Sequence, residues 1–171
     1  MTLEFGAPWS RSLKTASTVS TGLLALIAAV GTFSLPARLW PAHALMIALP
    51  VMVLAIAFVN MVSGYALSST ELEVRRPLWS NSFPLAELLA VNGDPQAFKG
   101  ALRLFGNGGL FSFTGYFWTR KLGLYRAFAT DPARAVVLKF GRRNIVITPD
   151  DPLHFIVRVR THLASRNIPQ T

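Results

Sequence analysis

Aromatic and cationic side chains alternate in one stretch of the sequence, where together they could bind an anionic surface. The stretch contains Trp118, Arg120, Lys121, Tyr125 and Arg126. Rings and cations interleaved in this way can dock on anionic lipid, on an acidic protein or on single-stranded nucleic acid. The alternative is an ordinary solvated basic surface. We therefore treat the stretch as a candidate binding surface.

Further basic residues lie beside a predicted hairpin tip and directly after an apolar segment. Most of the net charge of +9 follows residue 67, and each Lys or Arg close to an anionic bilayer contributes about 1 kcal/mol of attraction. We expect anionic headgroups or a protein partner, rather than nucleic acid, to meet these side chains. The candidate lipid-binding or partner-binding residues are Arg75, Arg76, Trp118, Arg120, Lys121, Arg126, Lys139, Arg142 and Arg143.

The acidic and imidazole side chains do not form a catalytic or metal-binding pattern. Acid–base hydrolysis needs two positioned carboxylates, and a metal site needs three or four converging ligands. The chain has eight acidic residues and no cysteine, and His154 and His162 lie on one helix with no third ligand near them in sequence. We expect no enzymatic activity, no catalytic residue, no metal and no cofactor. Four aspartates stand beside proline or at a helix start, where capping explains them: Asp94, Asp131, Asp150 and Asp151.

A glycine-rich segment, Gly106-Asn107-Gly108-Gly109, lacks the lysine that a phosphate-binding loop requires. We expect it to form a turn or bulge between two strands. A different hypothesis uses the glycine-aromatic run 108–117 as one wall of a pocket, in an enzyme or a small-ligand receptor.

Two uncharged apolar segments near the N-terminus are each long enough to cross a bilayer. About 20 apolar residues in a helix span the hydrocarbon core, and segments 17–35 and 42–66 meet this length. Pro36 and Pro41 lie between them and would interrupt a continuous helix. The pattern predicts a transmembrane helical hairpin.

Basic residues at the span ends predict the orientation of this hairpin. Arg11 and Lys14 precede the first span, Arg75 and Arg76 follow the second, and the connecting loop carries Arg38 alone. Since basic residues stay on the cytoplasmic side, both termini should be cytoplasmic, in the cell inner membrane.

Two further interpretations concern the spans. Segment 42–44 has the small-x-small form of a signal-peptidase site, so the alternative is a first span that is a cleaved signal peptide. Asn60 and Ser63 are polar groups near the end of the second span. We expect them to serve packing within the hairpin.

After Ser68 the apolar residues recur with a period of two, which is typical of half-buried strands. The clearest hairpin joins strands at 135–140 and 145–147 through the turn 141–144. A C-terminal helix should follow at about 149–164, with Thr148 as its N-cap and Pro149 at its first position.

The segment from Gly64 to Leu163 resembles the bacterial pleckstrin-homology-like (PH-like) domain of small membrane proteins. The resemblance implies a seven-stranded, partly open barrel closed by the last helix, and it implies no single activity. The turn 68–70 stands where lipid-reading members of the wider superfamily carry basic residues, and it has none. The stretches that carry the resemblance are residues 72–76, 82–85, 108–117 and 145–152.

The predicted architecture is therefore α+β, with a two-helix transmembrane hairpin before a PH-like, partly open β-barrel that a C-terminal α-helix caps. We expect a cytoplasmic segment at 1–14, the hairpin at 15–67 and the β domain at 68–171. The expected function is a membrane-anchored binding or scaffolding module, an accessory or assembly subunit that engages another membrane protein. The alternatives are a receptor domain for a small ligand or anionic lipid, and an enzyme.

Overall fold

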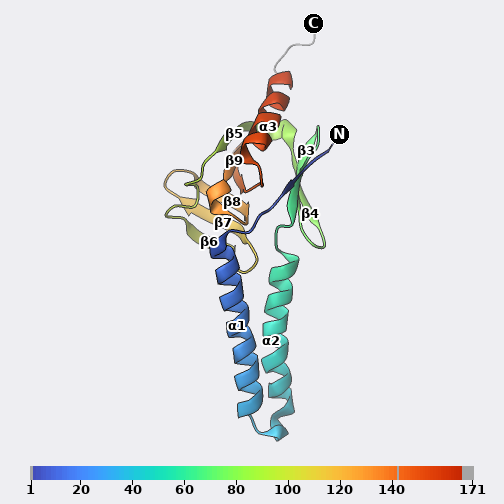
Figure 1. Ribbon diagram of the computed structural model, residues 1–171, viewed down its shortest axis with the longest axis vertical. Helices are drawn as coiled ribbons and strands as arrows, with labels where there is room; N and C mark the ends of the chain where they lie inside the picture. Colours follow the sequence, from blue (N-terminus) through green and yellow to red (C-terminus); the bar gives the residue numbers. More distant parts are fainter. Residues whose placement is uncertain (1, 142, 167–171) are drawn as a thin grey trace.

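The computed structural model describes residues 2–141 and 143–166, which form a helical hairpin and a β domain (Figure 1). Helix α1 (Arg11–Ser34) and helix α2 (Trp40–Val59) run side by side and extend from one end of the β domain. The short 3-10 helix η1 (Ala37–Leu39) connects them. Ser10 caps α1, because its hydroxyl accepts a hydrogen bond of 3.1 Å from the Leu13 amide.

The hairpin helices are apolar and mostly uncovered. Only 6% of the most apolar window of α1 and 11% of that of α2 is buried. Side chains such as Phe33 and Leu45 are more than half exposed. The two helices are long and apolar enough to span a membrane, as the sequence predicts. They differ from the core helix of a soluble domain, which its neighbours would cover.

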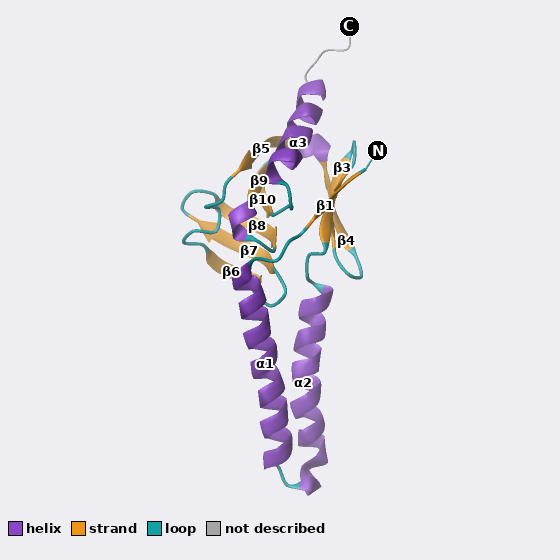
Figure 2. Ribbon diagram, in the orientation of Figure 1, coloured by secondary structure: helices purple, strands orange, loops and turns teal. Residues whose placement is uncertain are grey.

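The β domain contains two sheets that do not close into a barrel (Figure 2). The four-stranded sheet has the order β1-β2-β3-β4, and the six-stranded sheet has the order β5-β9-β10-β8-β7-β6. The expected partly open, PH-like architecture is confirmed. The strands are β1 (Leu3–Gly6), β2 (Gly64–Leu67), β3 (Glu71–Arg75), β4 (Ser80–Pro84), β5 (Leu88–Gly93), β6 (Leu102–Gly108), β7 (Phe113–Thr119), β8 (Gly123–Ala129), β9 (Val136–Phe140) and β10 (Arg143–Ile147).

Helix α3 (Pro152–Arg166) covers one side of the space between the sheets. Its buried residues Phe155, Ile156 and Val159 join a core with side chains of both sheets, among them Val74 and Leu138. A second, smaller core lies on the other face of the six-stranded sheet. The loop before β6 covers this second core through Ala97 and Phe98.

The chain N-terminal to the hairpin belongs to the β domain. Strand β1 pairs antiparallel with β2, with Phe5 opposite Tyr65. The Ser10 amide donates to the Thr130 carbonyl, 3.1 Å away. The segment 1–14 therefore supplies an edge strand, which was not predicted, because four residues with one buried side chain give almost no periodicity.

The second helix ends at Val59, seven residues before the expected limit of 66. Asn60 caps it, and residues 64–67 form β2, in which all four residues are buried. An apolar run of this kind is compatible with a helix or with a buried strand, so hydropathy alone extended the helix too far.

The predicted hairpin at the end of the domain is present as β9 and β10, with Phe140 paired to Arg143. Its tip is tighter than expected, and Gly141 has a φ of 49°. Arg142 lies outside the described residues.

The C-terminal helix begins later than predicted. Asp151, rather than Thr148, is its cap, since the Asp151 carboxylate accepts from the His154 amide at 3.0 Å. Pro152, rather than Pro149, takes the first helical position. The expectation for Thr148 was wrong because its side chain turns into the protein and is fully buried.

Candidate functional site

A cavity lies between the C-terminal end of α2 and the strands β6, β7 and β8, and we call it the arginine cleft. Its volume is about 540 Å³, within the range of small-molecule sites. Its lining is apolar along α2 and cationic where β3 and β8 meet it. The lining residues are Val53, Ile56, Ala57, Asn60, Arg76, Phe105, Gly106, Asn107, Leu110, Thr114, Gly115, Tyr116 and Arg126.

Arg76 follows β3 and reaches back to the end of α2. Its guanidinium donates to the Asn60 carbonyl and to Asn81 Oδ1, the latter at 3.0 Å. It also lies over the Phe128 ring, with 5.3 Å between Cζ and the ring centroid. These contacts hold a half-buried cation at the point where the hairpin joins the β domain.

Arg126 enters the same cleft from β8. Its Cζ lies 4.8 Å from the centroid of Phe128 and 5.9 Å from that of Tyr116. Arg126 is half-buried, and the ring contacts orient its guanidinium without neutralising it.

The two cations share the cleft without an acidic partner. Among the ion pairs of residues 2–141 and 143–166, none includes Arg76 or Arg126. Burial, and then the charge of Arg126, lower the pKa of Arg76. Burying a cation without a counter-charge is costly. An anionic group seated between the two guanidiniums would remove that cost and accept charge-assisted hydrogen bonds.

Two facing glycines shape the wall of the cleft. Gly106 of β6 pairs with Gly115 of β7, and their φ angles are 110° and 131°. A Cβ atom added at Gly106 would lie 2.2 Å from the Thr114 carbonyl oxygen, and one at Gly115 would lie 2.2 Å from the Phe105 carbonyl oxygen. Only glycine fits this close backbone contact. The sequence predicts a turn or bulge at 106–109, but residues 106–108 are the paired end of β6 and shape the wall, and only Gly109 lies in the connection to β7.

The loop between β6 and β7 is fastened to α1. Buried Ser17 donates to the Gly109 carbonyl at 3.1 Å, and its oxygen accepts from the Phe111 amide at 2.9 Å. Phe111 has a φ of 67°, which is unusual for a residue with a side chain. The Trp9 ring lies 6.0 Å from that of Phe111. This serine thus fixes the β domain against the hairpin, although α1 was predicted only as a span.

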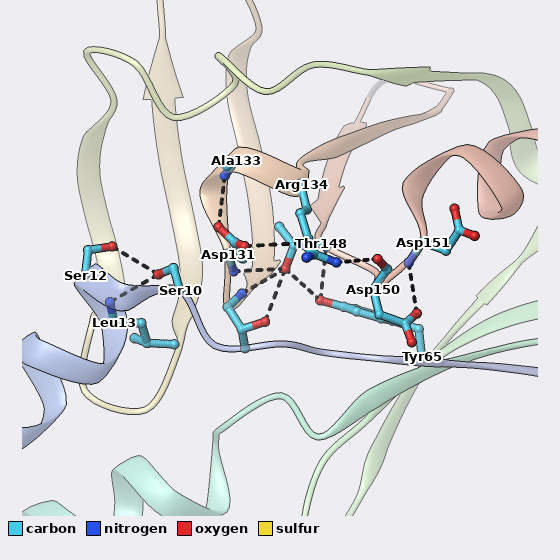
Figure 3. Close-up of polar contacts among 11 residues, drawn as sticks. Ser10, Ser12, Leu13, Tyr65, Asp131, Ala133, Arg134, Thr148, Asp150 and Asp151 are labelled. Atoms are coloured by element: carbon cyan, nitrogen blue, oxygen red, sulfur yellow. Dashed lines mark hydrogen bonds and ion pairs between the residues drawn. The ribbon is translucent and has the colours of Figure 1, made fainter.

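A buried hydrogen-bond network holds the two sheets together (Figure 3). The Tyr65 hydroxyl donates to the Phe128 carbonyl at 2.7 Å and accepts from the Thr148 amide at 3.1 Å. The Thr148 hydroxyl accepts from the Thr130 amide at 2.9 Å. Burial raises the pKa of Tyr65 to about 12. The network is closed to solvent, so its role is to position Phe128 beneath the arginines.

The other predicted binding residues do not gather in one place. Arg75 pairs with Glu4 at 2.8 Å, and Arg143 pairs with Glu87 at 3.0 Å. These partners explain both cations as surface ion pairs. Lys139 is exposed on β9.

Three predicted residues do meet, at the turn between β7 and β8. Trp118, Arg120 and Lys121 line a hollow there with Lys99. Lys121 pairs with Asp94 at 2.7 Å. Because Asp94 already neutralises one of its cations, this hollow is less suited to an anion than the arginine cleft.

Some residues of the cleft could not be inferred from sequence. Asn60 was expected to pack within the hairpin, and its side-chain amide does donate to the Ile56 carbonyl of α2, but its own carbonyl also accepts from Arg76 of the β domain. Phe105 and Tyr116 line the cleft from separate strands. The signal for the cleft in the sequence was Asn60 at the end of an apolar span, with Arg75 and Arg76 after it.

Metal-binding side chains do not cluster in the described part of the chain. No group of three or more His, Asp or Glu residues there could hold a metal ion. The cleft therefore offers hydrogen-bond donors and positive charge as its chemistry.

Comparison with known protein families gives a match over the β domain. A family model described as "Bacterial PH domain" matches residues 63–163, which is more than half of the chain. The match begins just before β2 and ends within α3, so it covers both sheets apart from β1. No match was found among curated proteins or among solved structures.

Proposed function

Because the chain belongs to the bacterial PH domain family, we propose that it is a membrane-anchored binding module whose arginine cleft holds an anionic group. The helical hairpin inserts in the cell inner membrane and both termini are cytoplasmic. The β domain rests on the cytoplasmic surface and acts by binding rather than by catalysis.

Membrane insertion is supported by the uncovered helices and by the loops beside them. The loop after β3 carries Leu78 and Trp79, which are 75% and 47% exposed. Its first residue, Arg76, contacts the end of α2. On the other side Phe111 lies against Trp9, close to the start of α1. Exposed apolar and aromatic tips at this level are typical of the boundary between lipid and water.

Anion binding is supported by a single observation, namely that Arg76 and Arg126 line one cleft without a carboxylate. A bound phosphate or carboxylate could accept from both guanidiniums. Each charge-assisted hydrogen bond of this kind contributes about 1.5–3 kcal/mol.

Thermal unfolding of the full chain in a zwitterionic detergent tests anion binding. At equal ionic strength, sodium phosphate should raise the unfolding temperature above its value in sodium chloride, by about 2–4 °C for each kcal/mol of binding. Arg126→Gln should remove the difference, and the exposed control Arg120→Gln should keep it. Equal unfolding temperatures of the wild-type chain in both salts would refute the proposal.

A second candidate function, engagement of another membrane protein, is favoured by the edge strand β6. This strand ends the six-stranded sheet, and Leu102, Leu104 and Phe105 are each at least 60% exposed. An exposed apolar edge can accept a strand of a partner. A photo-crosslinker at Leu104 in native membranes should then yield one discrete adduct that a crosslinker at Lys139 does not. Identical patterns from both positions would count against this candidate.

A further inference from the structure

The lining of the arginine cleft is apolar at one end and cationic at the other. At one end Val53, Ile56 and Ala57 contribute apolar side chains from α2. At the other end stand Arg76 and Arg126. A small soluble anion would occupy only the cationic end of the cleft, whereas an amphiphile would match both the cationic and the apolar ends.

The apolar end lies on the part of α2 that would be inside the bilayer. Val53 precedes the last helical residue, Val59, by six positions, which is about 9 Å along the axis at 1.5 Å per residue. The headgroup region of one leaflet is roughly 5–8 Å thick. With the end of α2 at the surface, Val53 meets acyl chains while Arg76, bonded to Asn60, stands at headgroup level.

The geometry points to an anionic glycerophospholipid of the surrounding leaflet as the occupant of the arginine cleft. Its phosphate lies between Arg76 and Arg126, and one acyl chain runs along Val53 and Ile56. This inference rests on the proposed anion-binding function and adds the class of ligand. It also places the lipid away from the turn 68–70, which has no basic residue.

Charge selects among lipids at this site. Arg76 and Arg126 are two cations without a carboxylate within the described residues. The ammonium of a phosphatidylcholine headgroup would bring a third positive charge close to them, which is unfavourable. Phosphatidylglycerol carries the phosphate without that ammonium, so it should bind and phosphatidylcholine should not.

Native mass spectrometry of the full chain, released from nanodiscs of equal parts phosphatidylglycerol and phosphatidylcholine, tests this. One phosphatidylglycerol should remain bound to the wild-type chain, with little phosphatidylcholine. Arg126→Gln should reduce the retained lipid about 10–100-fold, the equivalent of one charge-assisted hydrogen bond. Within residues 2–141 and 143–166 the Arg126 side chain contacts the Tyr116 and Phe128 rings and makes no ion pair, so this variant should still fold. The exposed controls Arg120→Gln and Lys139→Gln should retain lipid as the wild-type chain does.

A second variant tests the apolar end. Ile56→Trp fills the cleft beside α2, and it should lower phosphatidylglycerol retention while the stabilisation by inorganic phosphate persists. Ile47→Trp is the matched control, because Ile47 is exposed on the same helix outside the cleft. It should leave both measurements unchanged.

The outcomes separate this inference from the proposed function. Two results would refute a phospholipid as the ligand: equal retention of the two lipids, or full retention of phosphatidylglycerol by Ile56→Trp. If phosphate still stabilised the protein in either case, the cleft would be a site for a soluble anion. Loss of phosphate stabilisation in the wild-type chain together with equal lipid retention would overturn both.

Discussion

Arg76 and Arg126 lie against the same aromatic ring, with their Cζ atoms 5.3 and 4.8 Å from the centroid of Phe128. They come from different sheets, one from the end of β3 and the other from β8. The ring attracts both cations, but it cannot cancel their mutual repulsion. The juxtaposition of these two cations therefore makes the protein less stable than it could be, which is common at binding sites.

Charge reversal at Arg126 should stabilise the ligand-free protein. In Arg126→Glu the new carboxylate faces Arg76 and replaces repulsion by an ion pair, so we expect a gain of about 1–3 kcal/mol in the free energy of unfolding. The same variant should no longer respond to phosphate. Thermal unfolding in detergent measures both effects. Arg120→Glu, on an exposed residue, should change stability by less than about 0.5 kcal/mol. A less stable Arg126→Glu protein would contradict the prediction.

Removing the Ser17 hydroxyl should free the loop between β6 and β7 from α1. Ser17→Ala leaves the Gly109 carbonyl and the Phe111 amide without their partner, at a cost of about 1–3 kcal/mol. The strained φ at Phe111 would then relax. Limited proteolysis of the loop in detergent should become faster. Thr18→Ala, at the exposed neighbouring position, is the control and should behave as the wild-type chain.

The architecture followed from the sequence because its signals are local. Two uncharged apolar runs and a proline-containing link predict the hairpin within one continuous stretch. Alternation with a period of two predicts the strands, and the hairpin of β9 and β10 is present as expected. In each case, neighbouring residues contain the whole pattern.

The site did not follow from the sequence, because its residues meet only in three dimensions. Arg76 and Arg126 were both candidates, yet nothing in the sequence separates them from Arg75 or Arg143, which pair with glutamates. Thr148 carries a capping residue type in a capping position, but the hydroxyl of Tyr65, 83 residues away, draws it into the core. Tertiary contacts thus override a local preference.

A methyl group at Gly106 should damage the wall of the cleft. Gly106→Ala brings Cβ to 2.2 Å from a backbone oxygen and imposes a φ of 110° on alanine. We expect a loss of more than about 3 kcal/mol. Gly100→Ala is the matched control, since Gly100 also has a positive φ but open space around its Cβ position, and it should lose only about 1 kcal/mol. Equal losses would show that backbone strain alone is responsible.

Alkaline solution should reveal the buried phenol of Tyr65. Its pKa is about 12 in the folded protein, against 10.0 ordinarily. The unfolded chain therefore loses this proton first, so the stabilisation is complete below pH 10 and falls as pH rises from 10 to 12. Tyr65→Phe should lower the free energy of unfolding by about 1–3 kcal/mol at pH 8, because it leaves the Thr148 amide unpaired. Between pH 8 and pH 11 the variant should lose less stability than the wild-type chain. Thermal unfolding at both values measures this, and parallel curves for the two proteins would contradict it.

The orientation of the hairpin can be tested by reporter fusions in living cells. A periplasmic alkaline phosphatase should be active when fused at Trp40, between the two spans, and inactive at residue 171. A cytoplasmic reporter should give the reverse pattern. The physical reason is that Arg11 and Lys14 precede α1, and Arg75 and Arg76 follow α2, whereas the connection carries Arg38 alone. Exchanging Arg11 and Lys14 for glutamines should weaken this preference. Activity of the same reporter at both positions would mean that only one helix spans the membrane, and the arginine cleft would then lose its place at the cytoplasmic surface.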